Sequence, residues 1–329
     1  MICPIALEEK YNNRTVLDLA LNNRPDTSWE AVILLLKKYA EAALERNEDD
    51  KIFLHLLLEE GAPLDVISLF LKIWPSAIKE MDCYGQTPLH LALKVGASLD
   101  VISSLLNSWP DATKEKDFCG ETPLYVACRL GTSFESIHLL LRSCPDAIKV
   151  KDINRSTPLH AACEGKASFD IIHLLLRSWP DAINEKDMLR DNPLDLASTF
   201  ISSLEVFLLL LDTWLDFPEN KSIHKVESLR KNARIIIDRL LVQILIFLND
   251  EVNTCPKESM SFFTNIKWQK GVLMFINKYP SIVKTMDLKT NLMASFLSAV
   301  GKCCSLATMC EVIKNEQELL KGVECLLVK

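Results

Sequence analysis

A five-residue phrase returns along this chain at a fixed interval of 35 residues. SWPDA occupies 108–112 and 178–182, SCPDA lies midway at 143–147, and IWPSA comes earlier, at 73–77. A second phrase keeps the same interval: TPLH, TPLY, TPLH and NPLD begin at Thr87, Thr122, Thr157 and Asn192. A constant period of this length is typical of a solenoid of stacked supersecondary units, so the chain is expected to fold as a linear array.

The unit at 82–116 predicts two short helices. Thr87 precedes a proline, so its hydroxyl is placed to cap a helix whose first turn holds that proline. Gly96 ends this helix, because glycine enters the left-handed conformation at little cost. A second helix opens at Ser98 or Asp100 and carries apolar residues at helical spacing.

The Trp-Pro pair of the repeated phrase ends the second helix, because a residue before proline is pushed out of helical geometry. A tryptophan such as Trp109 buries about 150–250 Å² when it is packed. At about 25 cal/mol per Å² this is a gross gain of roughly 4–6 kcal/mol. We therefore expect the phrase to hold adjacent units together; an aromatic ladder for ligand binding is the alternative.

The full pattern, D-x-x-G-x-T-P-L-H-x-A followed by glycine and a V-I-x-x-L-L helix, resembles the ankyrin repeat. The resemblance implies an all-α ankyrin-repeat solenoid of helix-turn-helix units joined by hairpin-like loops. The usual ankyrin period is about 33 residues. The two extra residues lie before the second helix and in the W-P-D-A phrase, which marks a long-period variant.

Extending the 35-residue frame in both directions predicts six repeats in residues 1–216, at 10–46, 47–81, 82–116, 117–151, 152–186 and 187–216. Residues 217–329 are predicted to be an α-helical region of degenerate repeats. It includes an apolar helix at about 226–249 and repeat-like patterns at 267–287 and 290–301. We expect this region to cap the array, because a terminal repeat must hide one face from water.

Four residues depart from the repeat where it normally uses glycine. Arg155 and Arg190 occupy the loop position, and Lys166 and Ile201 occupy the position between the two helices. Side chains disfavour the left-handed conformation that glycine adopts there. The last two repeats are therefore predicted to have altered turns.

Composition narrows the class of function. The net charge is −7, with 33 acidic against 21 basic residues up to position 216, which does not indicate a DNA-binding protein. The eleven cysteines contain no Cys-x-x-Cys pair, so no metal site is predicted and a reducing compartment, cytoplasm or nucleus, is expected. The first residues hold too short an apolar run for a signal peptide, and charges interrupt the most apolar stretch before it reaches a membrane span.

No pattern of catalytic residues appears. The chain lacks a Gly-x-Ser-x-Gly elbow, a phosphate loop, a His-Glu-x-x-His motif and a kinase signature, so no enzyme, cofactor or small-molecule substrate is predicted. His55, His90 and His160 share one repeat position, where the resemblance implies that histidine braces neighbouring loops. A metal or catalytic role for these histidines is the alternative.

The loop tips and the inner face of the first helices form the binding surface that the resemblance implies. An apolar row follows the tips of consecutive repeats and polar residues flank it, as expected for an interface. The alternative is that the apolar residues fold inward or shield adjacent loops. The candidate partner-binding residues are Cys83, Tyr84, Gln86, Lys94, Phe118, Cys119, Glu121, Arg129, Ile153, Glu164, Met188 and Leu189.

These patterns predict a non-enzymatic adaptor or scaffold that binds another protein and is itself a monomer. The alternative places the activity in the basic helical C-terminal region, where an apolar face is accompanied by Lys221, Lys225, Arg230, Lys231, Arg234 and Arg239. Such a face would suit an anionic membrane or a nucleic acid. The solvated side of a packed helix explains the same bases, so neither partner is favoured over a protein.

Overall fold

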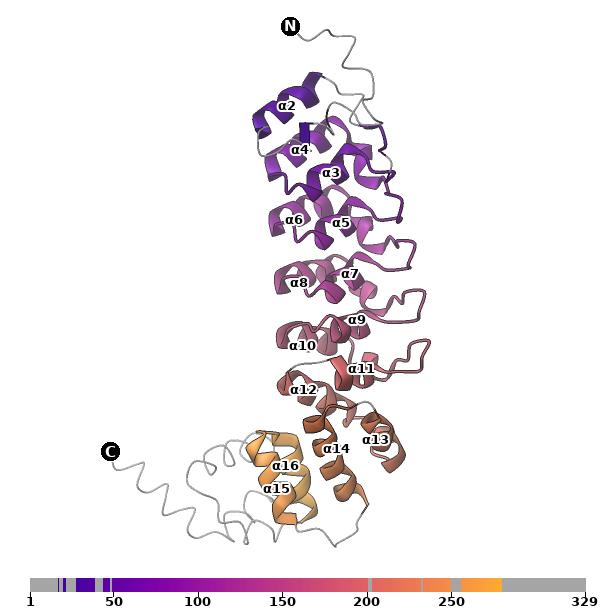
Figure 1. Ribbon diagram of the computed structural model, residues 1–329, viewed down its shortest axis with the longest axis vertical. Helices are drawn as coiled ribbons and strands as arrows, with labels where there is room; N and C mark the ends of the chain where they lie inside the picture. The colour runs from indigo at the N-terminus through magenta and orange to yellow at the C-terminus, as the bar shows by residue number, and fades with distance from the viewer. Residues whose placement is uncertain are drawn as a thin grey trace, which may run out of the picture. The chain divides into compact units, whose positions relative to one another are not determined.

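The computed structural model describes residues 28–38, 44–47, 49–200, 203–231, 233–249 and 256–279, together with residues 17, 20 and 21. The chain divides into two compact units, Met1–Trp214 and Leu215–Lys329. In the described ranges every regular element is an α-helix or a short 3₁₀ helix (Figure 1). The all-α fold class implied by the resemblance is confirmed.

The first unit is a stack of helix pairs (Figure 1). The inner helices are α3 (Phe53–Glu59), α5 (Pro88–Lys94), α7 (Pro123–Leu130), α9 (Pro158–Glu164) and α11 (Pro193–Phe200). The outer helices are α2 (Trp29–Lys38), α4 (Leu64–Ile73), α6 (Leu99–Ser108), α8 (Phe134–Ser143), α10 (Phe169–Ser178) and α12 (Leu204–Trp214). Neighbouring inner helices pack on one another, and their buried leucines and alanines form a continuous core along the stack.

The predicted helix starts are confirmed. Thr87 is the N-cap of α5, its side chain accepts from the backbone N–H of His90, and a proline fills the first turn. The outer helix α6 begins after Ser98, whose Oγ accepts from the Val101 N–H at 3.4 Å. Of the two starting points left open by the sequence, Ser98 is therefore the cap, and Asp100 lies inside the helix.

The repeated phrase, Trp-Pro or once Cys-Pro, ends the outer helices α4, α6, α8 and α10 and starts a 3₁₀ helix at its proline. These helices are η3 (Pro75–Lys79), η4 (Pro110–Lys114), η5 (Pro145–Lys149) and η6 (Pro180–Asn184). Trp109 leaves helical geometry at φ −147° and ψ 85°, as its proline neighbour requires. The 3₁₀ helices pack on the following repeat: η4 contacts α7, and η6 contacts α11.

The alanine of this phrase is even more deeply buried than the tryptophan. Trp109 and Trp179 are partly buried, and Ala112 and Ala182 are almost fully buried. The Lys79 Nζ of the preceding repeat is 5.9 Å from the Trp109 ring centroid. The small alanine lets the 3₁₀ helix approach the next repeat, and the share of the tryptophan in holding the repeats together stays a prediction.

The change of turn geometry predicted for the later repeats is wrong at Arg155, Lys166 and Arg190. Arg155, Lys166 and Arg190 keep positive φ values of 62°, 55° and 68°, close to those of the glycines that they replace. The Arg155 N–H donates to the Asp152 carbonyl at 3.1 Å, just as the Gly85 N–H donates to Asp82 at 2.9 Å. The neighbouring repeats determine the turn, so the backbone of these residues keeps a conformation that is strained for any residue with a side chain.

Replacing Arg155 and Arg190 by glycine is therefore expected to stabilise the array. An L-residue costs about 1–2 kcal/mol in the left-handed region, and the extra chain entropy of glycine removes roughly 0.5–1 kcal/mol of the gain. A net increase of about 0.5–1 kcal/mol per site should appear in urea unfolding. Arg142→Gly, inside α8 with ordinary helical geometry, is the control and should lose about 1 kcal/mol. A loss at all three sites would contradict the strain argument.

The second unit contains α13 (Ile223–Arg230), α14 (Ile235–Leu248), α15 (Pro256–Asn265) and α16 (Gln269–Lys278). The single helix predicted at about 226–249 is two helices, because Arg234 is extended at φ −65° and ψ 155° and the apolar pattern starts only at Ile235. An aromatic cluster fills the core, with the Phe263 centroid 4.9 Å from Trp268 and 5.2 Å from Phe275.

Helix α16 coincides with the repeat-like pattern predicted at 267–287 and ends at Tyr279, the residue in the tryptophan position. The pattern at 290–301, most of the first predicted repeat at 10–46, and Ile201 lie outside the described residues. The division of 1–216 into six repeats and the capping role of 217–329 stay predictions.

Candidate functional site

The loops at 82–86 and 117–121 are each folded around one buried aspartate. Asp82 Oδ1 accepts from the backbone N–H groups of Tyr84 at 3.0 Å and Gln86 at 2.8 Å. Asp117 repeats this arrangement with the N–H groups of Cys119 and Glu121, both at 2.9 Å. Such side-chain bonds replace the backbone partners that a tight turn lacks. Both loops form tight turns, in agreement with the hairpin-like loops that the resemblance implies.

Neighbouring loops are joined by one backbone hydrogen bond at each junction. The N–H of Phe118 donates to the Tyr84 carbonyl at 3.0 Å, and the N–H of Ile153 donates to Cys119 at 3.1 Å. The same bond recurs between Met188 and Asn154 at 2.9 Å. The tips are therefore held at fixed positions along the array by the main chain, independently of their side chains.

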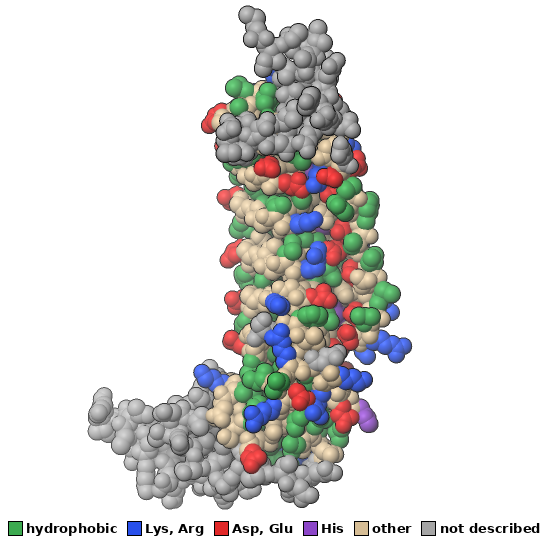
Figure 2. Space-filling view, in the orientation of Figure 1, with side chains coloured by type: hydrophobic (Ala, Val, Ile, Leu, Met, Phe, Trp, Pro, Cys, Tyr) green, Lys and Arg blue, Asp and Glu red, His purple; other side chains and the backbone are tan. Residues whose placement is uncertain are grey.

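The apolar side chains at these tips are exposed. Between 58% and 79% of the surface of each large apolar tip residue is accessible, and the two tip cysteines are also exposed. Figure 2 shows hydrophobic side chains along the loop edge of the stack. We call this set the loop-tip row; it consists of Cys83, Tyr84, Phe118, Cys119, Ile153, Met188 and Leu189.

Two members of the row also touch the preceding loop. A Cβ added to Gly85 would lie 2.6 Å from the Phe118 ring, and one added to Gly120 would lie 3.2 Å from Ile153 Cγ2. These glycines let the next tip residue lie against the main chain, yet Phe118 stays 72% and Ile153 62% exposed. The alternative left open by the sequence, that these residues shield adjacent loops, therefore holds for one flank of each side chain. The other flank faces solvent, and partner binding there stays a prediction.

The predicted polar flank begins with Lys94 at the end of α5. Its Nζ lies 5.7 Å from the Tyr84 ring centroid and 3.5 Å from Gln86 Oε1. Lys94 is exposed, whereas Gln86 is only 8% exposed. Gln86 is thus an exception among the candidate residues, since it supports Lys94 and offers almost no surface.

The next repeat replaces this pair by an ion pair. Arg129 Nη2 lies 2.8 Å from Glu121 Oε2, and both side chains are partly buried. Burial raises the pKa of Glu121, and the ion pair with Arg129 opposes that rise. Glu164, one repeat further, is exposed and forms no ion pair within the described ranges, while burial and the carboxylates of Asp187 and Asp152 raise its pKa. The flank changes from basic to acidic along the array.

His90 and His160 brace the loops, as the resemblance implied. His55, at the same repeat position, differs: its Nδ1 accepts from the Ile52 N–H of its own repeat at 3.2 Å, and its Nε2 forms no hydrogen bond within the described residues. The Thr87 N–H donates to His90 Nδ1 at 3.3 Å, so Nε2 carries the hydrogen and donates to the Glu121 carbonyl of the next repeat at 3.1 Å. His160 makes the equivalent bond to Asp191 at 3.2 Å. Tyr125 takes the same position in the repeat between them, and its hydroxyl donates to Asp152 Oδ2 at 3.2 Å. His90, His160 and Tyr125 all join adjacent repeats.

The tip thiol of Cys119 is not activated as a nucleophile. Partial desolvation, with the carboxylates of Asp117 and Glu121, raises the pKa of the Cys119 thiol and keeps it protonated. Among the described residues no group of three or more His, Cys, Asp or Glu side chains could hold a metal ion. In the same ranges no helix is long and apolar enough to cross a membrane.

Sequence reasoning missed two features of the surface. The hydroxyl bond of Tyr125 to the next loop was not predicted, although its place in the histidine position signalled it. The outer helices carry stacked rings, with Phe134 5.8 Å from His138 and Phe169 6.0 Å from His173. Their spacing of four residues on one helix face was the available signal.

Comparison with known proteins agrees with this geometry. A family model described as ankyrin repeats (3 copies) matches residues 42–152, 94–187 and 124–220, which together cover more than half of the chain. A search of curated proteins finds no match. Ankyrin repeats generally mediate protein–protein interaction and are typically non-enzymatic modules. By its repeats, its helix pairs and its braced loops, the chain belongs to the ankyrin-repeat family.

Proposed function

We propose that this protein is a non-enzymatic adaptor or scaffold that binds another protein through the loop-tip row and the inner face of α5, α7 and α9. The exposure of the loop-tip row is the observation that carries this proposal. Apolar side chains that remain exposed in consecutive repeats, beside charged residues, match an interface with an apolar centre and a polar rim.

The main chain supports the same function. Buried aspartates and inter-loop hydrogen bonds hold the tips before any partner arrives. A preorganised surface loses little conformational entropy on association, so more of the contact energy appears as affinity. Six repeats capped by 217–329 would present this surface as one curved face.

The charge of the proposed surface also changes along the array. Lys94 and Arg129 lie on its earlier repeats, and Glu164 lies on a later one. A partner with an acidic group at one end of its contact and a basic group at the other would complement this order. Charge pairs at the rim mainly set orientation and association rate, whereas the apolar tips supply affinity.

Phe118→Ser combined with Ile153→Ser is expected to weaken partner binding at least tenfold, or about 1.4 kcal/mol. Both side chains are more exposed than buried, so the thermal midpoint should move by no more than about 2 °C. The measurement is affinity purification of the tagged full chain from its own cells, read by quantitative mass spectrometry, followed by binding titrations with the recurrent partner.

Phe134→Ser with Phe169→Ser is the matched control. It removes two half-exposed aromatic rings from the outer helices and leaves the tips intact, so it should retain the partner. Equal loss with both double variants would show that the effect is not specific to the tips. Unfolding of the Phe118/Ile153 variant would show that these residues belong to the core and would refute the proposed face.

A further inference from the structure

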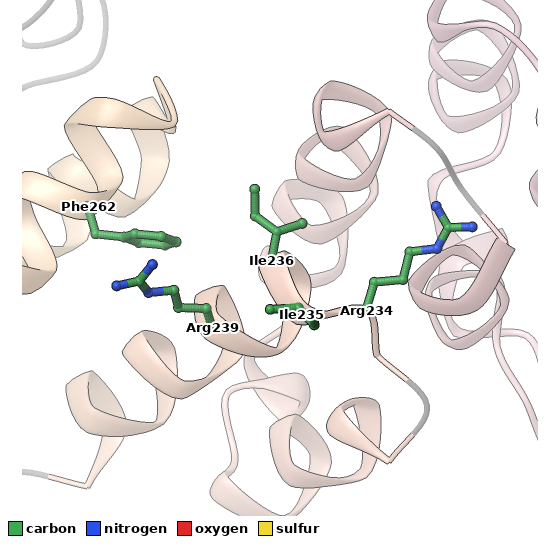
Figure 3. A pocket seen from close by; sticks show the side chains of 5 residues that line it. All are labelled: Arg234, Ile235, Ile236, Arg239 and Phe262. Carbon is green, nitrogen blue, oxygen red and sulfur yellow. The ribbon is translucent and has the colours of Figure 1, made fainter.

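A shallow hollow of about 620 Å³ lies on the second unit, between the start of α14 and α15. Its lining consists of Arg234, Ile235, Ile236, Arg239 and Phe262 (Figure 3). Cavities of this size accommodate a few side chains of a peptide. Its walls combine apolar surface with positive charge. All the lining residues lie in the second unit, outside the repeats described above.

Two isoleucines, Ile235 and Ile236, form the apolar floor of the hollow and are unusually exposed for apolar residues. Ile235 is 90% and Ile236 49% exposed, while Ile237, the next residue, is buried in the core of the unit. A helix that needed only one buried stripe would place polar residues at the first two positions. Two adjacent exposed isoleucines therefore mark surface that a binding partner could cover at a gain in free energy.

The two arginines beside these isoleucines, Arg234 and Arg239, are available to pair with a charged ligand. Arg230 Nε is held by Asp238 Oδ1 at 2.7 Å, whereas Arg234 and Arg239 form no ion pair in the part of the chain that the structure describes. The Arg239 guanidinium lies 5.7 Å from the centroid of the Phe262 ring. Figure 3 shows Arg239 reaching toward that ring and Arg234 extending to the opposite side of the two isoleucines.

The start of α14 adds to this positive field. Arg234 is its N-cap residue and caps no backbone N–H with its side chain. The first-turn amides of a helix carry partial positive charge that favours anions. A carboxylate near Arg234 would therefore gain both an ion pair and the helix end.

We propose that this hollow binds an acidic peptide segment in which a bulky apolar side chain is flanked by carboxylates on both sides. The apolar side chain would cover Ile235 and Ile236, one carboxylate would pair with Arg234, and the other with Arg239 over Phe262. The two arginines lie on either side of the two isoleucines. A peptide with the residue order acidic, apolar, acidic would therefore complement the hollow. This site is independent of the loop-tip row.

A peptide suits the hollow better than a membrane or a nucleic acid. Bilayer insertion requires several apolar side chains along a broad basic face, whereas the lining here holds only three apolar residues, Ile235, Ile236 and Phe262. Single-stranded nucleic acid needs open aromatic rings for base stacking, and Arg239 already occupies the face of Phe262.

The test is an array of short peptides that vary independently in acidic and apolar content, probed with the labelled full chain. Peptides with an apolar residue between acids should be enriched among the binders, and their affinity should fall as salt rises. Arg234→Glu and Ile235→Ser should each weaken the best such peptide at least tenfold in solution titrations, with an unchanged thermal midpoint. Lys221→Glu, a matched charge reversal in the same unit outside the hollow, should leave the affinity unchanged.

Three results would overturn the proposal. Enrichment of basic or purely apolar peptides would exclude this ligand chemistry, and equal binding by the hollow variants and the wild type would place any acidic-peptide site elsewhere. Binding to phosphatidylserine vesicles that requires Arg234 and Ile235, without binding of acidic peptides, would identify a membrane contact instead. Retention of the partner of the repeats by Arg234→Glu would show that the two proposed surfaces are separate.

Discussion

Gly165→Ala is expected to lower the free energy of unfolding by about 3 kcal/mol, at the upper end of the usual cost of overpacking. A Cβ at this position would lie 2.0 Å from the carbonyl oxygen of Arg129 and 2.7 Å from its carbonyl carbon. Both are backbone atoms of α7, so no side-chain rotation relieves the clash. Helices α7 and α9 would have to separate, which would disturb the core between two repeats.

Whether Gly165→Ala stabilises or destabilises the protein distinguishes between two physical arguments. Gly165 has φ −70° and ψ −3°, a conformation that alanine adopts freely. Glycine to alanine at such a position ordinarily stabilises a protein by about 0.4–1 kcal/mol, because the unfolded chain loses freedom. Stabilisation would therefore be expected from local geometry, and destabilisation from the close approach of two helices.

Gly96→Ala is the control, since its properties are the reverse. A Cβ at Gly96 meets no atom within 4 Å, but the residue has φ +69°. Its replacement should cost about 1–2 kcal/mol of backbone strain without any clash. Urea unfolding of both variants measures the order, and a Gly165→Ala variant as stable as the wild type would mean that α7 and α9 lie further apart.

Acidification from pH 7 to pH 4.5 is expected to destabilise the array through its buried histidines. Burial lowers the pKa of His55 from 6.5 to about 4, and it also lowers the pKa values of His90 and His160. The unfolded chain then binds more protons than the folded one in this window. The stability is present above about pH 6.5 and is lost as pH falls toward the folded pKa values; complete protonation of His55 would remove about 3 kcal/mol.

Carboxylates with raised pKa values act in the opposite direction. Burial raises the pKa values of Glu121, Glu164 and Asp195, so their protonation favours the folded state as pH falls. The total pH profile is therefore a difference between two groups of residues. Only a comparison between variants isolates the part that belongs to the histidines.

The chain itself supplies the right variant. Tyr125 occupies the histidine position and reaches Asp152, and the aspartates at the equivalent positions for His90 and His160 are Asp117 and Asp187. His90→Tyr with His160→Tyr should preserve the inter-repeat contact, because burial raises the tyrosine pKa and the side chain stays neutral. Urea unfolding at several pH values should show a flatter loss of stability below pH 6.5. An unchanged slope would mean that other groups control acid unfolding.

Features fixed by near neighbours in the chain could be predicted from the sequence. Thr87 with its following proline determined the start of α5, and the proline after Trp109 determined the end of α6. The exposed positions of Phe118 and Ile153 followed from their place in the repeat. In each case the cause lies within a few residues of the effect.

Features that depend on distant residues could not be predicted. Nothing near Gly165 indicates the approach of Arg129, and nothing near Arg155 shows that its turn is fixed by adjacent loops. The almost complete burial of Ala112 depends on how closely two repeats pack. The hollow on the second unit required the position of α15 against α14, which the degenerate pattern after 216 does not encode locally.

The hydrogen bonds between successive loops have a consequence for how a ligand finds its place. The main chain is nearly the same every 35 residues, so a ligand that read only the backbone could slide by one repeat and bind equally well. The tips break this translational symmetry, since Cys83, Phe118, Ile153 and Met188 differ in size and shape at equivalent positions. Under the proposed function, these differences between tips would allow a long ligand to bind in a single register.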